Sequence, residues 1–287
     1  MRLLVEPSYK DSNIFNTCKS VILSLKDYSV QGFCYFTIED IIEIKNKYKD
    51  IEIFVSLNKN FLNHEVEALK DVLVKLNDIG VSGVFFYDLV VLQLKKELNL
   101  DINLVWNQTH MVNNYRTCDY YYSKGVKYAL LGKEITLDEI VEICNKSSIS
   151  CMVEVVSLPS VAFSRRKLIT NYYADMGLPS KSELIVHEKV SDKDYELLEN
   201  SDGTSFFIKE VMNGTGVIKT LYDNGVSYII MREFGIDKDL FNELVIDTNK
   251  YIEDGCVSSD YVSKYKKLGD STNFFFKKTI YKVKKNG

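Results

Sequence analysis

Polar side chains recur where short apolar runs of this sequence end. Carboxylates are common general acids and bases, while amides, lysines and arginines bind anions and orient substrates. If the apolar runs are parallel strands, their carboxyl ends meet at one edge, and these side chains form one polar pocket for a small ligand. The candidates are Glu6, Asn58 with Lys59, Asp88, Asn107 with Gln108 and His110, Lys133 with Glu134, Glu154, and Arg232 with Glu233.

The sequence lacks the residue patterns of several standard catalytic and metal-binding sites. There is no HxH or HExxH spacing for a metal, no CxxC pair and no GxSxG nucleophile elbow. His110 is the one histidine that follows a predicted strand, and a hydrogen-bonded loop residue is the alternative reading of it. We expect His64 and His187 to lie on the surface, and we expect no metal site.

The elements that would position these residues alternate between two patterns. Short runs of β-branched or aromatic residues are each followed by apolar residues at helical spacing. Thr37 and Thr136 each open such a helical stretch with an acid three residues later, which is typical of a capping box. Gly80, Gly125 and Gly225 each end one and precede a valine that begins the next run. We expect strands to start near Arg2, Val30, Ile51, Ser82, Asn103, Lys127, Cys151 and Ser227.

Eight such units predict an α/β fold, a (β/α)8 TIM-type barrel, over an open doubly wound sheet. No GxGxxG or GxxxxGK[ST] motif supports the nucleotide-binding alternative. The barrel is expected to occupy residues 1–255. An insertion at about 157–212, between the seventh and eighth strands, contains an antiparallel hairpin around Asp202-Gly203. Residues 256–287 are expected to form a tail packed on the barrel, with a basic contact surface as the alternative.

Composition limits the partners. The 287 residues carry 36 Lys and Arg against 40 Asp and Glu, a net charge of −4, so no global basic field attracts nucleic acid. With 46% hydrophobic residues the chain is not disordered, and no apolar run is long enough to cross a bilayer. Six scattered cysteines indicate free thiols in a reducing cytoplasm. We therefore expect a cytoplasmic protein with no membrane partner.

Several stretches resemble peptidase family U32, whose members include collagenase-like proteases and subunits that support the hydroxylation of RNA or ubiquinone. The matching stretches are VFFYD ending at Asp88, LVWNQ ending at Gln108, GVKYALLGKEITLDEI, CMVEVV, Ser164–Lys167, the Asp202-Gly203-Thr204 turn and the tail FFFKKTIYKVKKNG. The resemblance implies a barrel fold, and it covers almost the whole chain.

The departures from the family pattern bear on the cofactor. Hydroxylation-linked members hold a [4Fe–4S] cluster through cysteines that follow a Glu-x-Phe-x-His-Gly run. Here Glu154 is kept, but Leu158 and Pro159 stand in place of His and Gly, and Lys167 stands in place of a cysteine. Because that cluster needs thiolate ligands, the resemblance implies a member without it.

Three functions remain open. The first is a cluster-less subunit that binds RNA, a small acid or a second U32 protein, with Arg165 and Arg166 contacting the anion. The second is a metal-independent, collagenase-like hydrolase with Glu134 or Glu154 as general base and Lys133 or Arg232 stabilising an oxyanion. The third is a barrel enzyme of unrelated small-molecule chemistry. The candidate catalytic residues are Glu134, Glu154 and Asp88, and the candidate ligand-binding residues are Asn58, Asn107, Gln108, His110, Lys133, Arg165, Arg166 and Arg232.

Overall fold

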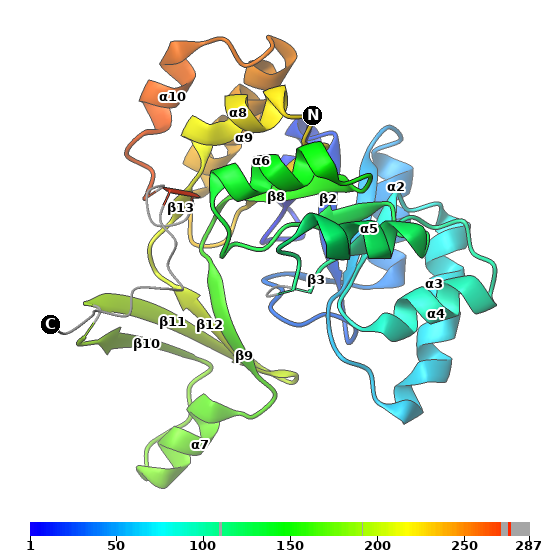
Figure 1. Ribbon diagram of the computed structural model, residues 1–287. Coiled ribbons are helices and arrows are strands. Elements are labelled where there is room, and N and C mark those ends of the chain that lie inside the picture. The colour runs from blue at the N-terminus through cyan, green and yellow to red at the C-terminus, as the bar shows by residue number, and fades with distance from the viewer. Residues whose placement is uncertain (109–110, 191, 271–274, 277–287) are drawn as a thin grey trace, which may run out of the picture.

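Eight parallel strands close into a barrel in the computed structural model, which describes residues 1–108, 111–190, 192–270 and 275–276 (Figure 1). Each strand pairs with the next around the ring, and β1 closes it by pairing with both β14 and β2. The expected (β/α)8 fold is confirmed. In ring order the strands are β1 (Arg2–Glu6), β2 (Ser20–Leu25), β4 (Glu52–Leu57), β5 (Gly83–Phe86), β6 (Leu104–Trp106), β7 (Tyr128–Leu130), β8 (Ser150–Ser157) and β14 (Tyr228–Arg232).

Helices surround the barrel, and their ends follow the sequence signals. Thr37 and Thr136 form the two capping boxes with Asp40 and Glu139. Gly80 adopts the left-handed conformation that ends a helix, with a φ of +72°. The helices are α1 (Ile14–Thr17), α2 (Ile38–Lys47), α3 (Val66–Ile79), α4 (Leu89–Glu97), α5 (Tyr115–Ser123), α6 (Leu137–Lys146), α8 (Ile218–Asp223), α9 (Lys238–Glu253) and α10 (Ser259–Tyr265), with single 3-10 turns at Asn63–Glu65 and Thr215–Val217.

The amino-terminal end of the barrel is filled by aromatic rings. Phe54, Tyr128 and Tyr228 meet edge to face, and the Phe54 and Tyr228 ring centroids lie 5.3 Å apart. Leu4, Ile22, Phe85, Val105, Leu130, Met152 and Ile230 complete this inner cluster. The packing leaves the carboxyl-terminal end of the strands as the place for a site.

A second, antiparallel sheet is inserted between β8 and β14. Its order is β10-β11-β12-β9, and Figure 1 shows it standing below the barrel with α7 (Leu168–Asp175) against it. The hairpin expected around Asp202-Gly203 joins β11 to β12. The insertion occupies about the expected residues, but it holds a four-stranded sheet and a helix rather than a hairpin alone, and the acidic segment at 193–200 is itself a strand. The strands are β9 (Ser160–Ser164), β10 (Glu183–Glu188), β11 (Lys193–Asn200) and β12 (Gly203–Ile208), and β13 (Met212–Asn213) returns to pair with β8.

The second barrel strand was misplaced by the sequence pattern. The strand expected from Val30 is a loop that ends in the two-residue β3 (Tyr35–Phe36), and the barrel uses Ser20–Leu25 instead. All six side chains of Ser20–Leu25 are buried. The preceding helix has only four residues, too few to show helical periodicity.

The carboxyl-terminal tail is described only in part, so its expected packing stays a prediction. Phe275 is buried and lies against Gly214, whereas Phe274 and residues 277–287 are outside the described residues. No helix in the described ranges is both long and apolar enough to span a membrane. All six cysteines are free thiols.

Candidate ligand-binding site

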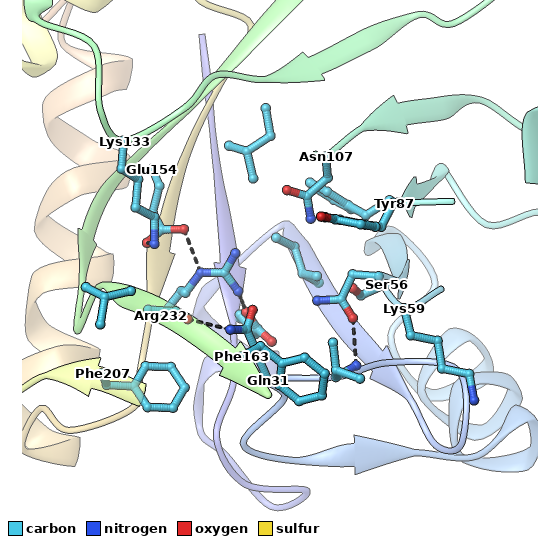
Figure 2. A pocket seen from close by; sticks show the side chains of 18 of the residues that line it. Gln31, Ser56, Lys59, Tyr87, Asn107, Lys133, Glu154, Phe163, Phe207 and Arg232 are labelled. Carbon is cyan, nitrogen blue, oxygen red and sulfur yellow. Dashed lines mark hydrogen bonds and ion pairs between the residues drawn. The ribbon is translucent and has the colours of Figure 1, made fainter. Parts of the chain in front are cut away.

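A cavity of about 540 Å³ lies at the carboxyl-terminal mouth of the barrel, between the strand ends and the inserted sheet (Figure 2). That volume suits a small organic ligand. Six of the residues singled out from the sequence as catalytic or ligand-binding line it. They are Asn58, Asn107, Lys133, Glu154, Arg165 and Arg232.

The pleat of the strands explains how polar residues reach this cavity. Side chains two positions apart on a strand face the same side. Leu4, Met152 and Ile230 belong to the inner apolar cluster, so Glu6, Glu154 and Arg232, two residues later, also face inward. The same step brings Ser56, Tyr87 and Asn107 to the mouth. The cavity is thus the polar layer directly above the apolar core of the barrel.

A charged network forms one wall of the cavity. The register of β1 and β14 pairs Glu6 with Arg232, and the two side chains form an ion pair. Arg232 Nε also donates to Glu154 Oε2 at 2.8 Å, and Lys133 Nζ lies 2.5 Å from Glu154 Oε1. Ser157 donates to the same Glu154 oxygen, and Ser24 donates to Glu6 at 3.1 Å. Two buried carboxylates are therefore balanced by two cations.

Burial affects the guanidinium of Arg232 in this wall. It lowers the pKa of Arg232 to about 10, which still leaves the guanidinium charged at neutral pH. Glu6 and Glu154 are each only 4% exposed. Charges this deeply buried persist only when they are paired and hydrogen-bonded, as they are here.

The inserted sheet and the loop after β2 form the opposite wall. Gln31 donates to the Ser160 hydroxyl at 2.5 Å, and Asn58 accepts from the Val30 amide at 2.8 Å. Phe33 stacks on Phe234 with centroids 3.6 Å apart and also meets Phe207 from β12. Aromatic surface from Phe33 and Phe207 therefore also lines the cavity. The arrangement suits a small ligand that has both polar or anionic groups and apolar surface.

Amides at the strand ends remain available to a ligand. Figure 2 shows Asn107 beside Tyr87, both facing the cavity. The side-chain amide of Asn107 makes no hydrogen bond to another described residue, so its donors and acceptor are free to bind a ligand.

Some predicted site residues do not line the cavity. Asp88 caps α4, accepting from the amides of Val90 and Phe61 at 3.0 Å each. Gln108 donates to the Tyr87 carbonyl at 2.6 Å and accepts from the Trp106 indole. Both follow an inward-facing residue by one position and so point outward.

Three other predicted residues also lie outside the cavity lining, and a fourth is not described. Glu134 is half-buried in the loop after β7, and Arg166 is exposed beside Arg165. Glu233 accepts from the amide of Ser8 at 2.6 Å and so fixes the loop after β1. His110 lies outside the described residues. Ligand or catalytic roles for these residues stay predictions.

Sequence reasoning missed several lining residues, among them Gln31, Phe33 and Asp202. Gln31 and Phe33 lie in the segment that was assigned to a strand, and Asp202 lies in the hairpin turn of the insertion. Burial raises the pKa of Asp202, an effect partly offset by Lys59 and Arg165 nearby. Gln31 has a φ of +61°, a conformation uncommon outside glycine. Because glutamine has no preference for that conformation, the sequence does not predict it.

The donor atoms around the cavity do not fit an iron–sulfur cluster. None of the six cysteines lines it. Leu158, where the family pattern has His, packs its methyl groups against Gly235, and Lys167 precedes α7. Among the described residues no group of three or more His, Cys, Asp or Glu side chains is arranged to hold a metal ion.

Comparison with known proteins shows to which family the chain belongs. The sequence model of "Peptidase family U32" matches residues 11–232. The chain belongs to this family. The U32 chain is 27% identical over 274 residues to "tRNA hydroxylation protein P2" of Bacillus subtilis (strain 168), covering 86% of this chain and 87% of that protein.

Two further similarities involve shorter stretches. "tRNA hydroxylation protein P1" of the same organism is 25% identical over 142 residues, which cover 48% of this chain and 33% of that protein. A solved structure of a U32 peptidase aligns with a TM-score of 0.45 and 12% identity, over 55% of this chain and 70% of that one.

Proposed function

We propose that this U32 protein is a ligand-binding subunit of a cytoplasmic tRNA hydroxylation system and that it works with a second U32 protein. The supporting observation is the similarity to tRNA hydroxylation protein P2 over 86% of the chain. The relatives named P1 and P2 come from one organism, which favours a paired arrangement.

The subunit is proposed to act without an iron–sulfur cluster of its own. Leu158 and Lys167 stand at the positions where the family pattern has His and Cys, and neither side chain can ligate such a cluster. The cavity would then hold the small-molecule reactant or a part of the RNA, and a partner would supply any redox chemistry. Protein purified anaerobically should contain no stoichiometric iron and no broad visible absorbance. Finding both would overturn this part of the proposal.

The cavity wall gives the residues their roles in this proposal. Arg232 and Lys133 hold Glu154 in place, and Glu6 balances the remaining charge. Asn58, Asn107 and Arg165 present polar groups to the ligand. Because both oxygens of Glu154 already contact a cation, it is poorly placed to activate water, and the geometry favours ligand binding over the hydrolase alternative.

Deletion of the gene tests the proposal. Mass spectrometry of total tRNA nucleosides should show a hydroxylated nucleoside lost in the deletion strain and restored by the gene. Unchanged hydroxylation would contradict the proposal. Cleavage of gelatin or casein by the wild-type protein, abolished by Glu154→Gln, would establish the hydrolase alternative instead.

A further inference from the structure

Exposed tyrosines and cations lie on α5. Tyr120 and Tyr122 are 58% and 50% exposed, whereas Tyr121 between them is buried and stacks on Trp106 at 3.9 Å. Tyr121 therefore secures the helix to the barrel, while its two neighbours lie on different faces of the helix. Arg116, Tyr120 and Lys124 follow one another at four-residue spacing and share one face of α5, which we call the tyrosine strip.

Cations lie over tyrosine rings of α5. Lys124 Nζ is 5.2 Å from the centre of the Tyr120 ring, and the Arg116 guanidinium is 5.3 Å from that of Tyr115. Both contacts are cation–π pairs of ordinary geometry. Within the strip, the exposed Tyr120 ring thus lies between two positively charged residues along the helix.

The positive charge of the strip is not neutralised nearby. Within the described part of the chain, neither Arg116 nor Lys124 lies within ion-pair distance of a carboxylate. The single acid of α5, Asp119, instead accepts from the Ser147 hydroxyl and the Ser148 amide at 2.9 and 3.0 Å. The strip therefore has two cations without an ion-pair partner among the described residues, on a protein whose net charge is −4.

We propose that the tyrosine strip is an RNA-binding surface on which an unpaired base stacks against Tyr120 while Arg116 and Lys124 contact phosphates. The inference rests on the proposed function, which brings a tRNA to the protein. An exposed aromatic ring beside lysine and arginine is a feature that binds single-stranded nucleic acid. Tyrosine and arginine also occur at protein–protein interfaces, so loss of a protein partner is one outcome of the test.

The strip connects to the cavity through the chain. α5 begins at Tyr115, soon after Asn107 of the cavity lining, and a helix of nine residues spans only about 13 Å. In Figure 1, α5 lies on the outside of the barrel beside α6. RNA held on the strip would have a neighbouring segment close to the barrel mouth.

Fluorescence anisotropy with a labelled, unmodified tRNA transcript tests the strip. Tyr120→Ala should weaken binding about tenfold because a base would lose its stacking partner, and Tyr120→Phe should bind like wild type because it keeps the ring. Arg116→Ala with Lys124→Ala should lower the slope of log K against log salt by about one to two, because two phosphate contacts are lost.

A matched control is available on the opposite side of the barrel. Lys238 Nζ lies 3.6 Å over the ring of Tyr9, which is 43% exposed. Tyr9 follows β1, and β1 is four strands from β6 in either direction around the ring. Tyr9→Ala with Lys238→Ala should leave tRNA binding unchanged. Circular dichroism spectra and melting temperatures should show that every variant is folded.

The outcomes separate the two proposals. Loss of binding in both strip variants and not in the control supports the strip. Normal tRNA binding by both strip variants overturns the strip but leaves the proposed function intact. If the wild type binds no tRNA, alone or with a second U32 protein, both proposals fail. If the strip variants lose only the second U32 protein, the surface is a protein interface and the RNA assignment is wrong.

Discussion

Arg232 donates its Nε hydrogen to Glu154 Oε2 at 2.8 Å, linking neighbouring strands β14 and β8 at the barrel mouth. The same guanidinium pairs with Glu6 on β1, so one side chain joins three adjacent strands. Removing a partner from a buried pair leaves an uncompensated charge, which is the costly case. Arg232 therefore both shapes the cavity and stabilises the barrel around it.

Arg232→Ala should lower the free energy of unfolding by about 3–5 kcal/mol in urea denaturation, because two buried carboxylates lose their cation. The control is Lys19→Ala, which removes an exposed pair with Glu253 and should cost at most about 1 kcal/mol. Equal costs for the two variants would show that the network is not buried as described.

The insertion should loosen in acid through Glu199. Burial alone would raise the pKa of this carboxyl, but hydrogen bonds from the hydroxyls of Thr170 and Thr204 and from the amides that open α7 hold it below its ordinary value. A lowered folded-state pKa stabilises above the unfolded value of about 4.3 and loses that effect as pH falls.

Hydrogen exchange of α7 measures this effect. Protection at 168–175 should decrease below about pH 4.3 in the wild type. In Glu199→Gln, protection should be lower at pH 7 and should change less with pH. A wild-type profile that stays flat on acidification would contradict the role of Glu199.

Gly203→Ala should disrupt the inserted sheet. Gly203 has a φ of +142°, and a Cβ there would lie 2.0 Å from the Ser164 carbonyl oxygen of β9. We expect a cost of at least about 3 kcal/mol from the strain and the overlap together. Gly177→Ala is the control, with a φ of +64° and no atom within 4 Å of its added Cβ, and should cost about 1–2 kcal/mol. Similar melting temperatures for both variants would disprove the clash.

The structure separates the two arginines that the sequence places together. Both are exposed, but Arg165 lines the cavity and Arg166 does not. Arg165→Ala should weaken tRNA or carboxylate binding about tenfold and flatten its salt dependence, while Arg166→Ala should change it less than threefold. Equal effects of the two substitutions would indicate a surface contact rather than a cavity contact.

Much of the fold could be predicted from local signals. Helix ends are set by residues within one turn of the chain, so the local sequence is enough to predict them. Examples are the capping boxes at Thr37 and Thr136 and the helix-ending Gly80. The strand at Ser20–Leu25 was missed because its neighbouring helix is too short to show a period, while the aromatic residues around Phe33 imitate a strand.

Part of the candidate site was also predictable. The pleat of the strands explains which predicted residues line the cavity and which do not. Glu154 and Arg232 lie two positions after inward-facing core residues, and this spacing could be recognised in the sequence. Asp88 and Gln108 each lie one position after an inward-facing residue and therefore face outward. Gln31 and Asp202 join the cavity only because the inserted sheet folds over the barrel mouth. No local signal in the sequence encodes that long-range contact.

The most direct measurement of the central claim is tRNA hydroxylation supported by a variant of the cavity wall. Asn107→Ala removes a side chain that faces the cavity without a described partner, so it should preserve the fold. In a strain lacking the native gene, this variant should restore at least tenfold less hydroxylated nucleoside than wild type, while Asn46→Ala on the exposed side of α2 restores the full amount. Full restoration by Asn107→Ala, at equal protein levels, would contradict the assignment of this cavity as the functional site.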